Sequence, residues 1–431
     1  MEKKLLALIM CVVMVIGSLP VYAFAEDGLN DWTYRVLNEE TKTASVIGYT
    51  GTETEITIPE EINGYSIVRI GKEAFRGNRN IIKVFVPDSV TAIYDAAFYG
   101  CLNMVELRLP TCLKSIGKEA FYNCRSIDGG IYVNVPVVGD YAFSYCKELK
   151  TVEFGESVKK IGVNAFEYCI ELESVDFNGH NALAVCENAF ADCFMLKSFE
   201  YEVIDKAKYD AVDFGTAAFS CCTSLENVCV NKVGNIGDYA FSGCEALKSF
   251  KSNWFSNSIG ESAFEDCSAL EEVEFGAIAL GLNQTIGDNA FRNCNSLKSF
   301  VFPRGITQAD SCVFENCTSL ESVFICENTI QIQNNYWSAF RNCPNLTTVY
   351  GYSGTYAEDF ANNNGYVFVP VSNGDINDDG EVTIADYTIT KTIIDGSMTD
   401  VSTYQRNVAD NNQDVSIDAF DLFQIDKTIN A

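Results

Sequence analysis

Histidine, tryptophan, proline and basic residues are all scarce in this 431-residue sequence. His180 is the single histidine, and there are three tryptophans and eight prolines. One histidine leaves no zinc site built from several histidines and argues against a histidine-based triad or dyad, so we expect His180 at the surface. Lysine and arginine number 30 against 59 acidic residues, a formal net charge of −29. Nucleic acid and anionic membranes would be repelled and are not expected as partners.

Long hydrophobic runs are also missing, apart from one at the N-terminus. That run is too short for a membrane span, so no membrane insertion is expected. Lys3 and Lys4 precede an apolar segment over residues 5–16, and residues 23–25 (Ala-Phe-Ala) form a small-x-small cleavage site. These are the parts of a secretory signal peptide. We therefore expect residues 1–25 to be removed and the mature protein to be secreted and extracellular.

What the sequence does contain is a repeat centred on an Ala-Phe pair or a close relative of it. Twelve copies follow one another at intervals of 22 to 29 residues, and an aliphatic residue stands six positions after each phenylalanine. The phenylalanines are Phe75, Phe98, Phe121, Phe143, Phe166, Phe190, Phe219, Phe241, Phe264, Phe291, Phe314 and Phe340. A fixed period of this length predicts a solenoid, in which each unit buries its apolar face against its neighbours. We expect these phenylalanines in the core rather than on a sugar-stacking surface.

Eighteen cysteines in a secreted chain would ordinarily indicate disulfides. Eleven of them, however, stand three positions after a repeat phenylalanine: Cys101, Cys124, Cys146, Cys169, Cys193, Cys222, Cys244, Cys267, Cys294, Cys317 and Cys343. Stacked about 4.8 Å apart with parallel Cα–Cβ bonds, these residues are poorly placed to bridge. We expect a buried, reduced column, with disulfides or metal binding as the alternatives. The pairing state of six further cysteines stays open: Cys112, Cys186, Cys221, Cys229, Cys312 and Cys326.

The local patterns also predict the elements of each unit. Residues 26–70 form short alternating segments typical of an N-terminal β cap, with a hairpin turn at Asn63-Gly64. Within a repeat, the alternation at residues 175–177 predicts one strand, and the 3-to-4 spacing of Gly-x-x-Ala-Phe-x-x-Cys-x-x-Leu predicts a short helical turn. Successive strands should stack as a parallel sheet. Longer spacings predict surface insertions at residues 201–213 and 277–285.

The unit Ile-Gly-x-x-Ala-Phe-x-x-Cys-x-x-Leu-x-x-Val-x-Phe resembles the BspA-type leucine-rich repeats of bacterial surface and secreted proteins, over residues 66–350. The resemblance implies an α/β repeat solenoid over residues 71–371 that serves as a binding scaffold. Residues 351–361 and 365–368 resemble the closing helix and strand of such arrays. The ligand is not identified by the resemblance, and an unknown protein or a polysaccharide remains open.

The composition changes at residues 372–431, where twelve acidic residues face three basic ones. Two stretches place oxygen-bearing residues at positions one, three, five, seven, nine and twelve of a calcium loop: Asp375, Asn377, Asp379, Glu381, Thr383 and Asp386, then Asp410, Asn412, Asp414, Ser416, Asp418 and Asp421. Oxygen ligands at these intervals wrap a hard cation of calcium size, and an apolar-periodic helix should follow each loop. A solvated turn is the plain alternative for one such stretch. Two stretches in register predict two bound calcium ions.

This duplicated loop-helix arrangement resembles a type I dockerin, a small all-α calcium-binding domain. The resemblance implies calcium-dependent binding to a cohesin domain of a scaffoldin in a cellulosome-type assembly. The implied cohesin contacts are Ile384, Ala385, Lys391 and Thr392 in the first half, and Ala419, Phe420, Asp426 and Lys427 in the second. The two sets differ, so single and dual docking orientations both remain open.

Together these patterns predict a secreted, non-catalytic binding or adhesion protein that a dockerin attaches to a scaffold or cell surface. One alternative is a dockerin-borne polysaccharide-degrading enzyme or accessory with an unrecognised active site. Another is a host-directed adhesin that uses the dockerin only as an anchor. No region the size of a separate catalytic domain interrupts residues 71–368, and no carboxylate pair departs from the repeat pattern, which argues against the enzyme. Trp254 and Trp337 are irregular aromatics that could make surface contacts.

Overall fold

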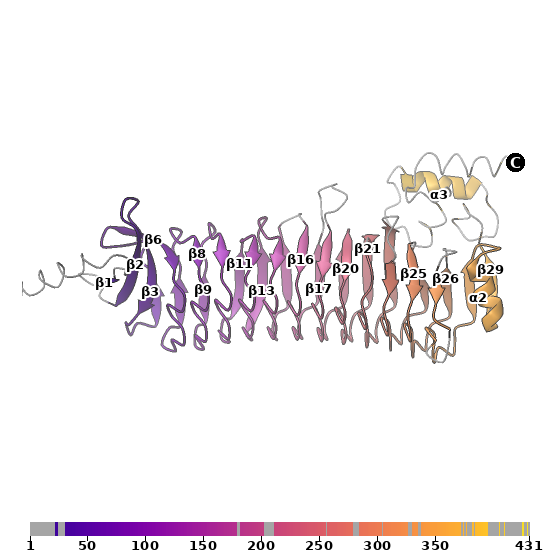
Figure 1. Cartoon of the computed structure of the whole chain (residues 1–431), viewed down its shortest axis with the longest axis horizontal. Coiled ribbons are helices and arrows are strands. Elements are labelled where there is room, and N and C mark those ends of the chain that lie inside the picture. Colours follow the sequence, from indigo (N-terminus) through magenta and orange to yellow (C-terminus); the bar gives the residue numbers. More distant parts are fainter. Residues whose placement is uncertain are drawn as a thin grey trace, which may run out of the picture.

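The computed structural model describes residues 22–24, 31–178, 182–201, 211–255, 257–278, 284–303, 305–325, 330–334, 338–371 and 384–394, with residues 374, 376, 382, 405, 409, 425 and 429. The repeats stack as coils along one axis and form an elongated rod (Figure 1). Its strands pair in parallel from coil to coil, and helices are few. The predicted insertions at 201–213 and 277–285 lie largely outside the described residues.

Each repeat contributes two strands, not the single strand that the sequence predicts. The first ends at the isoleucine of the Ile-Gly pair, or at its equivalent, and builds what we call the Ile-Gly ladder, in which successive strands pair in parallel. Bridges through Ile259 continue it from β20 to β23. Its strands are β6 (Tyr65–Ile70), β8 (Ala92–Ile93), β10 (Ser115–Ile116), β12 (Val137–Val138), β14 (Lys160–Ile161), β16 (Leu183–Val185), β18 (Val212–Phe214), β20 (Val233–Ile236), β23 (Gln284–Ile286), β25 (Ile306–Ala309) and β27 (Gln331–Ile332).

The second strand of each repeat builds a Val-x-Phe ladder, also parallel. Its strands are β4 (Glu55–Thr57), β7 (Lys83–Phe85), β9 (Glu106–Arg108), β11 (Gly129–Val133), β13 (Leu149–Phe154), β15 (Ser174–Phe177), β17 (Ser198–Tyr201), β19 (Asn227–Val230), β21 (Ser249–Phe255), β22 (Glu272–Ile278), β24 (Ser299–Val301), β26 (Ser322–Ile325) and β28 (Thr348–Gly351). Both ladders begin before residue 71, at β4 and β6.

The short helical turn predicted for the Ala-Phe segment is a series of hydrogen-bonded turns and does not extend into a helix. The N–H of Ala165 donates to the carbonyl of Gly162 at 3.2 Å, within the turn. The next N–H, that of Phe166, donates instead to Ala189 in the following coil at 2.8 Å. Asn164 adopts a φ of 55°, in the left-handed region that ends an α-helix. Because alternate donors leave the segment, no continuous α-helical ladder forms.

The glycine of the Ile-Gly pair is required where successive coils approach most closely. A Cβ at Gly162 would lie 2.6 Å from the carbonyl oxygen of Val138 in the preceding coil. Real Cβ atoms do not reach such distances, so a larger side chain would force the two coils apart. The glycine of the motif is therefore required by a close contact between neighbouring repeats.

The twelve repeat phenylalanines form one continuous stack in the core. Neighbouring ring centroids lie 4.6 to 5.4 Å apart with interplanar angles of 1° to 16°. Other buried side chains from both ladders pack around this stack in a single hydrophobic cluster. The prediction of core phenylalanines is confirmed.

The repeat cysteines form a second column beside the rings. Each Sγ donates a hydrogen bond to the phenylalanine carbonyl of the preceding repeat, at 2.9 to 3.4 Å. Burial raises the pKa of thiols such as Cys169, which keeps them protonated and able to donate. The first repeat has no preceding phenylalanine and carries Asn78 instead, whose Oδ1 accepts the N–H of Asn80 at 2.9 Å. Every cysteine that the structure describes carries a free thiol.

Short antiparallel strands cover the N-terminal end of the rod. Strand β2 (Trp32–Asn38) pairs antiparallel with β1 (Tyr22–Phe24) and with β3 (Thr43–Tyr49), and β3 then pairs in parallel with β6. The hairpin predicted at Asn63-Gly64 joins β5 (Glu61–Ile62) to β6, with φ of 50° and 78° at its two central residues. Both φ values are positive, as a type I′ turn requires.

A helix and a strand close the C-terminal end. Helix α2 (Tyr356–Asn364) ends at Gly365 with a φ of 75°, and β29 (Val367–Pro370) then pairs in parallel with β28. Beyond them, α3 (Ile384–Ile394) belongs to a separate small hydrophobic cluster around Ile376, Ala409 and Ile425. The described residues therefore have two hydrophobic cores rather than one.

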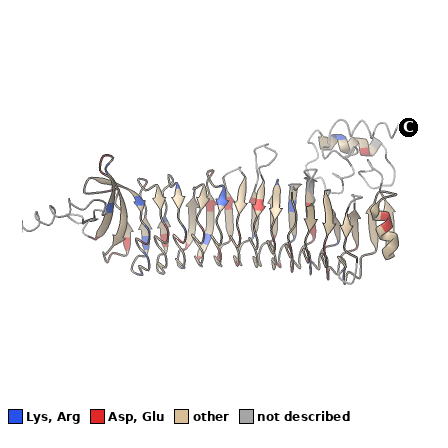
Figure 2. Cartoon of the chain, viewed as in Figure 1, with Lys and Arg blue, Asp and Glu red and all other residues tan. Residues whose placement is uncertain are grey.

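Acidic and basic residues are interspersed along the rod (Figure 2). In nine successive repeats the residue seven positions after the phenylalanine alternates strictly in sign: Asp128, Lys150, Glu173, Lys197, Glu226, Lys248, Glu271, Lys298 and Glu321. Ion pairs of 2.6 to 3.0 Å join Lys150 to Asp128, Lys197 to Glu173 and Lys248 to Glu226. Stacking places like positions side by side, where equal charges would repel, so alternation favours the native register.

Candidate functional site

The candidate site lies on the surface formed by the turns, which we call the turn face. It consists of the residues one and two positions after each repeat phenylalanine. The phenylalanines and cysteines of these turns are buried and nearly invariant from coil to coil, whereas the turn-face residues change in size and charge along the rod. The turn face divides into an aromatic half in the early repeats and a charged half in the late ones.

The charged half contains a row of alternating ion pairs. Arg292 Nη1 lies 3.2 Å from Glu265, and Arg292 Nε lies 3.4 Å from Glu315. Arg341 Nη1 lies 3.3 Å from the other oxygen of Glu315. Glu315 is buried between the two guanidinium groups, whereas the side chains of Arg292 and Arg341 remain 40% and 33% exposed. Each charge in this row is therefore compensated by a residue one coil away.

A row of amides runs beside these ion pairs. Asn293 donates to Asp266 at 2.6 Å, Asn316 to Asn293 at 2.7 Å, and Asn342 to Asn316 at 3.0 Å. Each of these asparagines has a φ between 56° and 64°. Asparagine tolerates this left-handed conformation better than most residues. The amide row thus combines a backbone requirement with hydrogen bonds between coils.

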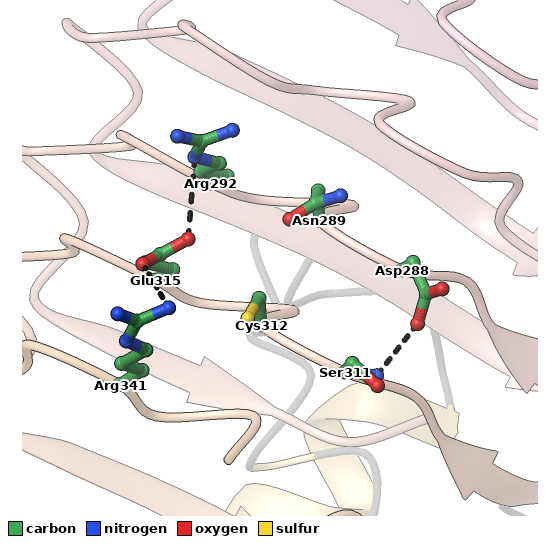
Figure 3. Close-up of a pocket in the computed structure, with 7 residues that line it drawn as sticks. All are labelled: Asp288, Asn289, Arg292, Ser311, Cys312, Glu315 and Arg341. Atoms are coloured by element: carbon green, nitrogen blue, oxygen red, sulfur yellow. Dashed lines mark hydrogen bonds and ion pairs between the residues drawn. The ribbon is translucent and has the colours of Figure 1, made fainter. Parts of the chain in front are cut away.

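A shallow pocket of about 610 Å³ opens in the charged half, lined by Asp288, Asn289, Arg292, Ser311, Cys312, Glu315 and Arg341. Figure 3 shows Glu315 between the two arginines, with Asp288 and Ser311 at the opposite end. The N–H of Ser311 donates to Asp288 Oδ1 at 2.8 Å. These contacts tie three successive coils together across the pocket.

The pocket lacks the features of a catalytic centre. Burial is the main reason that the pKa of Cys312 is raised, so its thiol is not activated as a nucleophile. Both carboxylate oxygens of Glu315 are already engaged by guanidinium groups, one by Arg292 and the other by Arg341. Within the described part of the chain, no group of three histidine, cysteine, aspartate or glutamate residues could hold a metal ion. The pocket is suited to polar binding.

The aromatic half carries a surface row of four tyrosines. The ring centroids of Tyr99 and Tyr122 lie 4.9 Å apart, those of Tyr122 and Tyr145 5.6 Å, and those of Tyr145 and Tyr168 4.7 Å. All four side chains are half-buried. The first and last pairs are stacked at about 20°, so much of each ring face is covered by its neighbour.

Two carboxylates accompany the tyrosines at the C-terminal end of this row. Burial raises the pKa of both Glu167 and Asp192, because an ionised carboxylate loses hydration there. Glu167 accepts a hydrogen bond from the Ser144 hydroxyl at 3.4 Å. Asp192 in turn is the main reason that the pKa of Tyr168 is raised. Among the described residues, neither carboxylate forms an ion pair with lysine or arginine.

The predicted calcium ligands fall almost entirely outside the described residues. Asp386 is the exception, as it lies on α3, is fully buried, and accepts the N–H of Ile376 at 2.8 Å. Ile376 and Asp386 occupy positions two and twelve of the first predicted loop, so the structure brings the two ends of that loop together. The other predicted ligands are not described: Asp375, Asn377, Asp379, Glu381, Thr383, Asp410, Asn412, Asp414, Ser416, Asp418 and Asp421.

The first-half cohesin contacts are placed on one helix. Ile384 begins α3, and Ala385, Lys391 and Thr392 follow within it, with Ala385 and Lys391 exposed. The second-half contacts lie outside the described residues: Ala419, Phe420, Asp426 and Lys427. The same holds for His180, for Trp337 and for the side chain of Trp254.

Sequence reasoning missed both halves of the turn face. The signal was present, since Tyr99 and Tyr122 stand one position after their phenylalanines, and Tyr145 and Tyr168 two positions after theirs. The same register places Glu265, Arg292, Glu315 and Arg341 one position after the later phenylalanines. Comparing non-core positions across repeats would have revealed both rows.

None of the described helices is long and apolar enough to cross a membrane.

Several solved structures are similar to this chain. They include a leucine rich cell surface protein from Faecalibacterium prausnitzii A2-165, with 27% identity, a TM-score of 0.45, and coverage of 80% of this chain and 98% of that one. A leucine-rich repeat protein from Bacteroides ovatus has 23% identity, a TM-score of 0.41, and coverage of 81% and 100%. The leucine rich repeat protein of T. pallidum has 29% identity, a TM-score of 0.42, and coverage of 46% and 90%. No curated protein is significantly similar to the chain.

The family comparison covers most of the repeats. Residues 49–131, 130–209 and 212–347 match the family described as the BspA type leucine rich repeat region, in six copies. The match extends over more than half of the chain and coincides with the coils that build the two ladders. The chain belongs to the BspA-type leucine-rich repeat family.

Proposed function

We propose that this protein is a secreted, extracellular, non-catalytic binding protein whose turn face is the recognition surface. A C-terminal dockerin-like domain, residues 372–431, attaches it in a calcium-dependent manner to a cohesin domain of a cellulosome-type scaffold. The signal-peptide pattern of residues 1–25 supports export. Solenoids of this kind offer long continuous surfaces to their ligands.

The observation that carries the binding role is the contrast between constant and changing columns. The core positions repeat the same phenylalanine and cysteine, because each must fit the same space between coils. The turn-face positions next to them change from Tyr122 and Tyr145 to Arg292 and Glu315 on the same backbone. A constant scaffold with a changing surface supports recognition of an extended partner along the rod.

The chemistry of the turn face favours binding over catalysis. Glycoside hydrolysis needs a carboxylic acid poised to donate a proton and a second carboxylate at a set distance. Glu315 is instead paired with Arg292 and Arg341, and Asp288 accepts a backbone N–H. An assay of reducing-sugar release from plant polysaccharides by the full chain should show none. Release that disappears in Glu315→Gln would favour an enzyme instead.

The residues of the C-terminal domain fit calcium. Asp386, at position twelve of the first loop, is fully buried and accepts the N–H of Ile376 at position two. The predicted donors Asp375, Asn377 and Asp379 precede it in the first loop, and six more oxygen donors recur in the second. Oxygen donors at these intervals suit calcium, which would hold each loop closed against its helix.

Cohesin binding by the full chain tests the attachment. We expect the intact protein to bind an immobilised type I cohesin in calcium and to release it on chelation. Asp375→Ala combined with Asp410→Ala should abolish binding, because each removes the first ligand of one loop. The matched control, Asp88→Ala combined with Asp176→Ala on the solenoid, should bind normally. Binding that persists after chelation contradicts the proposed attachment.

A further inference from the structure

We propose that the aromatic half of the turn face binds an extended, arginine- and lysine-rich segment of a partner protein. The surface consists of Tyr99, Tyr122, Tyr145, Tyr168, Glu167 and Asp192. This inference rests on the binding role proposed above and names the chemistry of the partner, which no sequence pattern identified.

Two basic side chains of the protein itself lie against rings of this row. The Arg76 guanidinium lies 4.3 Å from the ring centroid of Tyr99, the first tyrosine of the row. The Lys147 ammonium lies 5.8 Å from the ring centroid of Tyr145. Both distances fall within the range of cation–π attraction. The row therefore accepts guanidinium and ammonium groups from neighbouring segments, and a partner can supply more of them.

The carboxylates at the C-terminal end of the tyrosine row lack the arginine partners that the acidic residues of the charged half have. Glu265 and Glu315 each pair with an arginine one coil away. At the corresponding end of the aromatic half, Glu167 and Asp192 are half-buried without such pairing among the described residues, and burial raises the pKa of each. A guanidinium group brought by a partner would compensate these charges through charge-assisted hydrogen bonds.

The dimensions of the row suit an extended peptide. Its four rings follow one another at intervals of 4.7 to 5.6 Å, so they span the length of roughly five extended residues. Alternate side chains of such a peptide would point toward the row. The net charge of −29 would also speed the approach of a cationic segment.

A neutral saccharide fits this surface less well. Sugars stack on open aromatic faces, whereas Tyr99 is stacked on Tyr122, and Tyr145 on Tyr168. The outer face of Tyr99 is covered by Arg76. Tyrosine hydroxyl oxygens and the carboxylates of Glu167 and Asp192 are hydrogen-bond acceptors, which suit the donors of guanidinium and ammonium groups.

The test measures binding of a fluorescent hexa-arginine peptide to the full chain in calcium and about 150 mM salt. We expect Glu167→Gln combined with Asp192→Asn to weaken binding about tenfold. The matched control, Glu271→Gln combined with Glu321→Gln, removes the same charge from exposed positions on the rod and should weaken it less than about twofold. Equal losses in the two variants would mean general attraction by an acidic protein and would overturn the proposal.

A second pair of substitutions tests the tyrosines without disturbing the backbone. Tyr145 and Tyr168 have φ of 63° and 58°, and the charged half carries asparagine at the same turn position with the same backbone conformation. Tyr145→Asn combined with Tyr168→Asn should therefore fold normally, as circular dichroism will verify, and lose at least about fivefold in affinity. Unchanged peptide affinity in the folded variant, or tyrosine-dependent binding of cellohexaose but not of the peptide, would overturn the proposal.

The same samples keep the two proposals distinguishable. All three double variants should bind cohesin in calcium as the unmodified chain does, because the substitutions lie on the solenoid. Peptide binding without cohesin binding would remove only the proposed attachment. Cohesin binding without a selective loss of peptide affinity in the aromatic-half variants would remove only the inference made here.

Discussion

The two halves of the turn face share one backbone, but they differ in how the charges of their acidic residues are compensated. In the charged half, Glu265, Arg292, Glu315 and Arg341 alternate in sign from coil to coil and compensate one another. In the aromatic half, tyrosines occupy the row and end at Glu167 and Asp192, which have no basic partner among the described residues. The charged half is satisfied internally, and the aromatic half is open to an external partner.

The comparison shows that acidic residues on a surface indicate a binding site only when the contacts of each side chain are known. Both halves contain acidic residues, and net charge alone would not separate them. The contacts between coils distinguish the two halves. In the charged half, Glu265 already has a cationic partner in Arg292 at 3.2 Å, so it does not need one from a ligand. We therefore assign the ion pairs of the charged half to contacts that stabilise the stacked coils, and the binding of cationic segments to the aromatic half.

The largest expected effect tests whether the two halves share an equivalent core. Phe143→Ala under the aromatic half and Phe314→Ala under the charged half should each cost about 3–5 kcal/mol, since each removes a fully buried ring from the same stack. Urea unfolding followed by circular dichroism measures both. A cost several-fold larger in one half would show that the cores differ and not only the surfaces.

The second prediction concerns the acids of the two halves. Glu315→Gln should destabilise the protein by about 1–3 kcal/mol, because Arg292 and Arg341 would lose a buried counter-charge. Glu167→Gln should have almost no cost, since its carboxylate is paired with no base among the described residues. The same unfolding experiment compares the two variants. Equal destabilisation would mean that Glu167 is also structural and would weaken its assignment to recognition.

The third prediction concerns the cysteine column beneath both halves. Cys169→Ala and Cys317→Ala should each cost about 1–2 kcal/mol, from a lost hydrogen bond to a phenylalanine carbonyl and from lost burial. Thiol titration of the unfolded, unreduced protein should find most of the eleven column cysteines free. Recovery of few free thiols would show that the column forms disulfides.

The fourth prediction separates the halves by pH. The folded-state pKa values of Glu167 and Asp192 are raised by burial, so the folded state binds their protons more tightly than the unfolded state does. Their contribution to stability should therefore fall as the pH rises from about 4, near the unfolded-state values, through the raised folded-state values. Glu167→Gln combined with Asp192→Asn should flatten this part of the pH–stability curve. An unchanged curve would contradict the assigned cause.

The smallest expected effect concerns the alternating charges along the rod. Lys197→Glu places a third negative charge between Glu173 and Glu226, and it should cost less than about 1 kcal/mol because these side chains are exposed. The control Lys114→Glu makes the same change at an exposed position outside the alternating series. The difference between the variants should shrink at high salt. No difference at low salt would leave the alternation without an energetic role.

The core and the ends of the rod were predictable because their signals are local or strictly periodic. The spacing of the phenylalanines identified the stacked column, and Asn63-Gly64 identified its hairpin from turn chemistry alone. The Ile-Gly strand of each repeat was missed because a strand as short as β14 (Lys160–Ile161) shows no alternation. The 3-to-4 spacing predicts a helical turn but not its hydrogen bonds to the next coil, such as that from the Phe166 N–H to Ala189.

The sequence by itself determined that this chain is a BspA-type solenoid with a buried phenylalanine-cysteine core, because each repeat must fill the same space between its neighbours. Only the tertiary structure decided which surface residues meet. Phe166 donates its N–H one coil ahead, Cys169 donates its thiol one coil back, and Arg292 and Arg341 hold Glu315 from either side. These partners stand 23 to 26 residues apart in the chain, and only the stacking of coils brings them within a few ångströms.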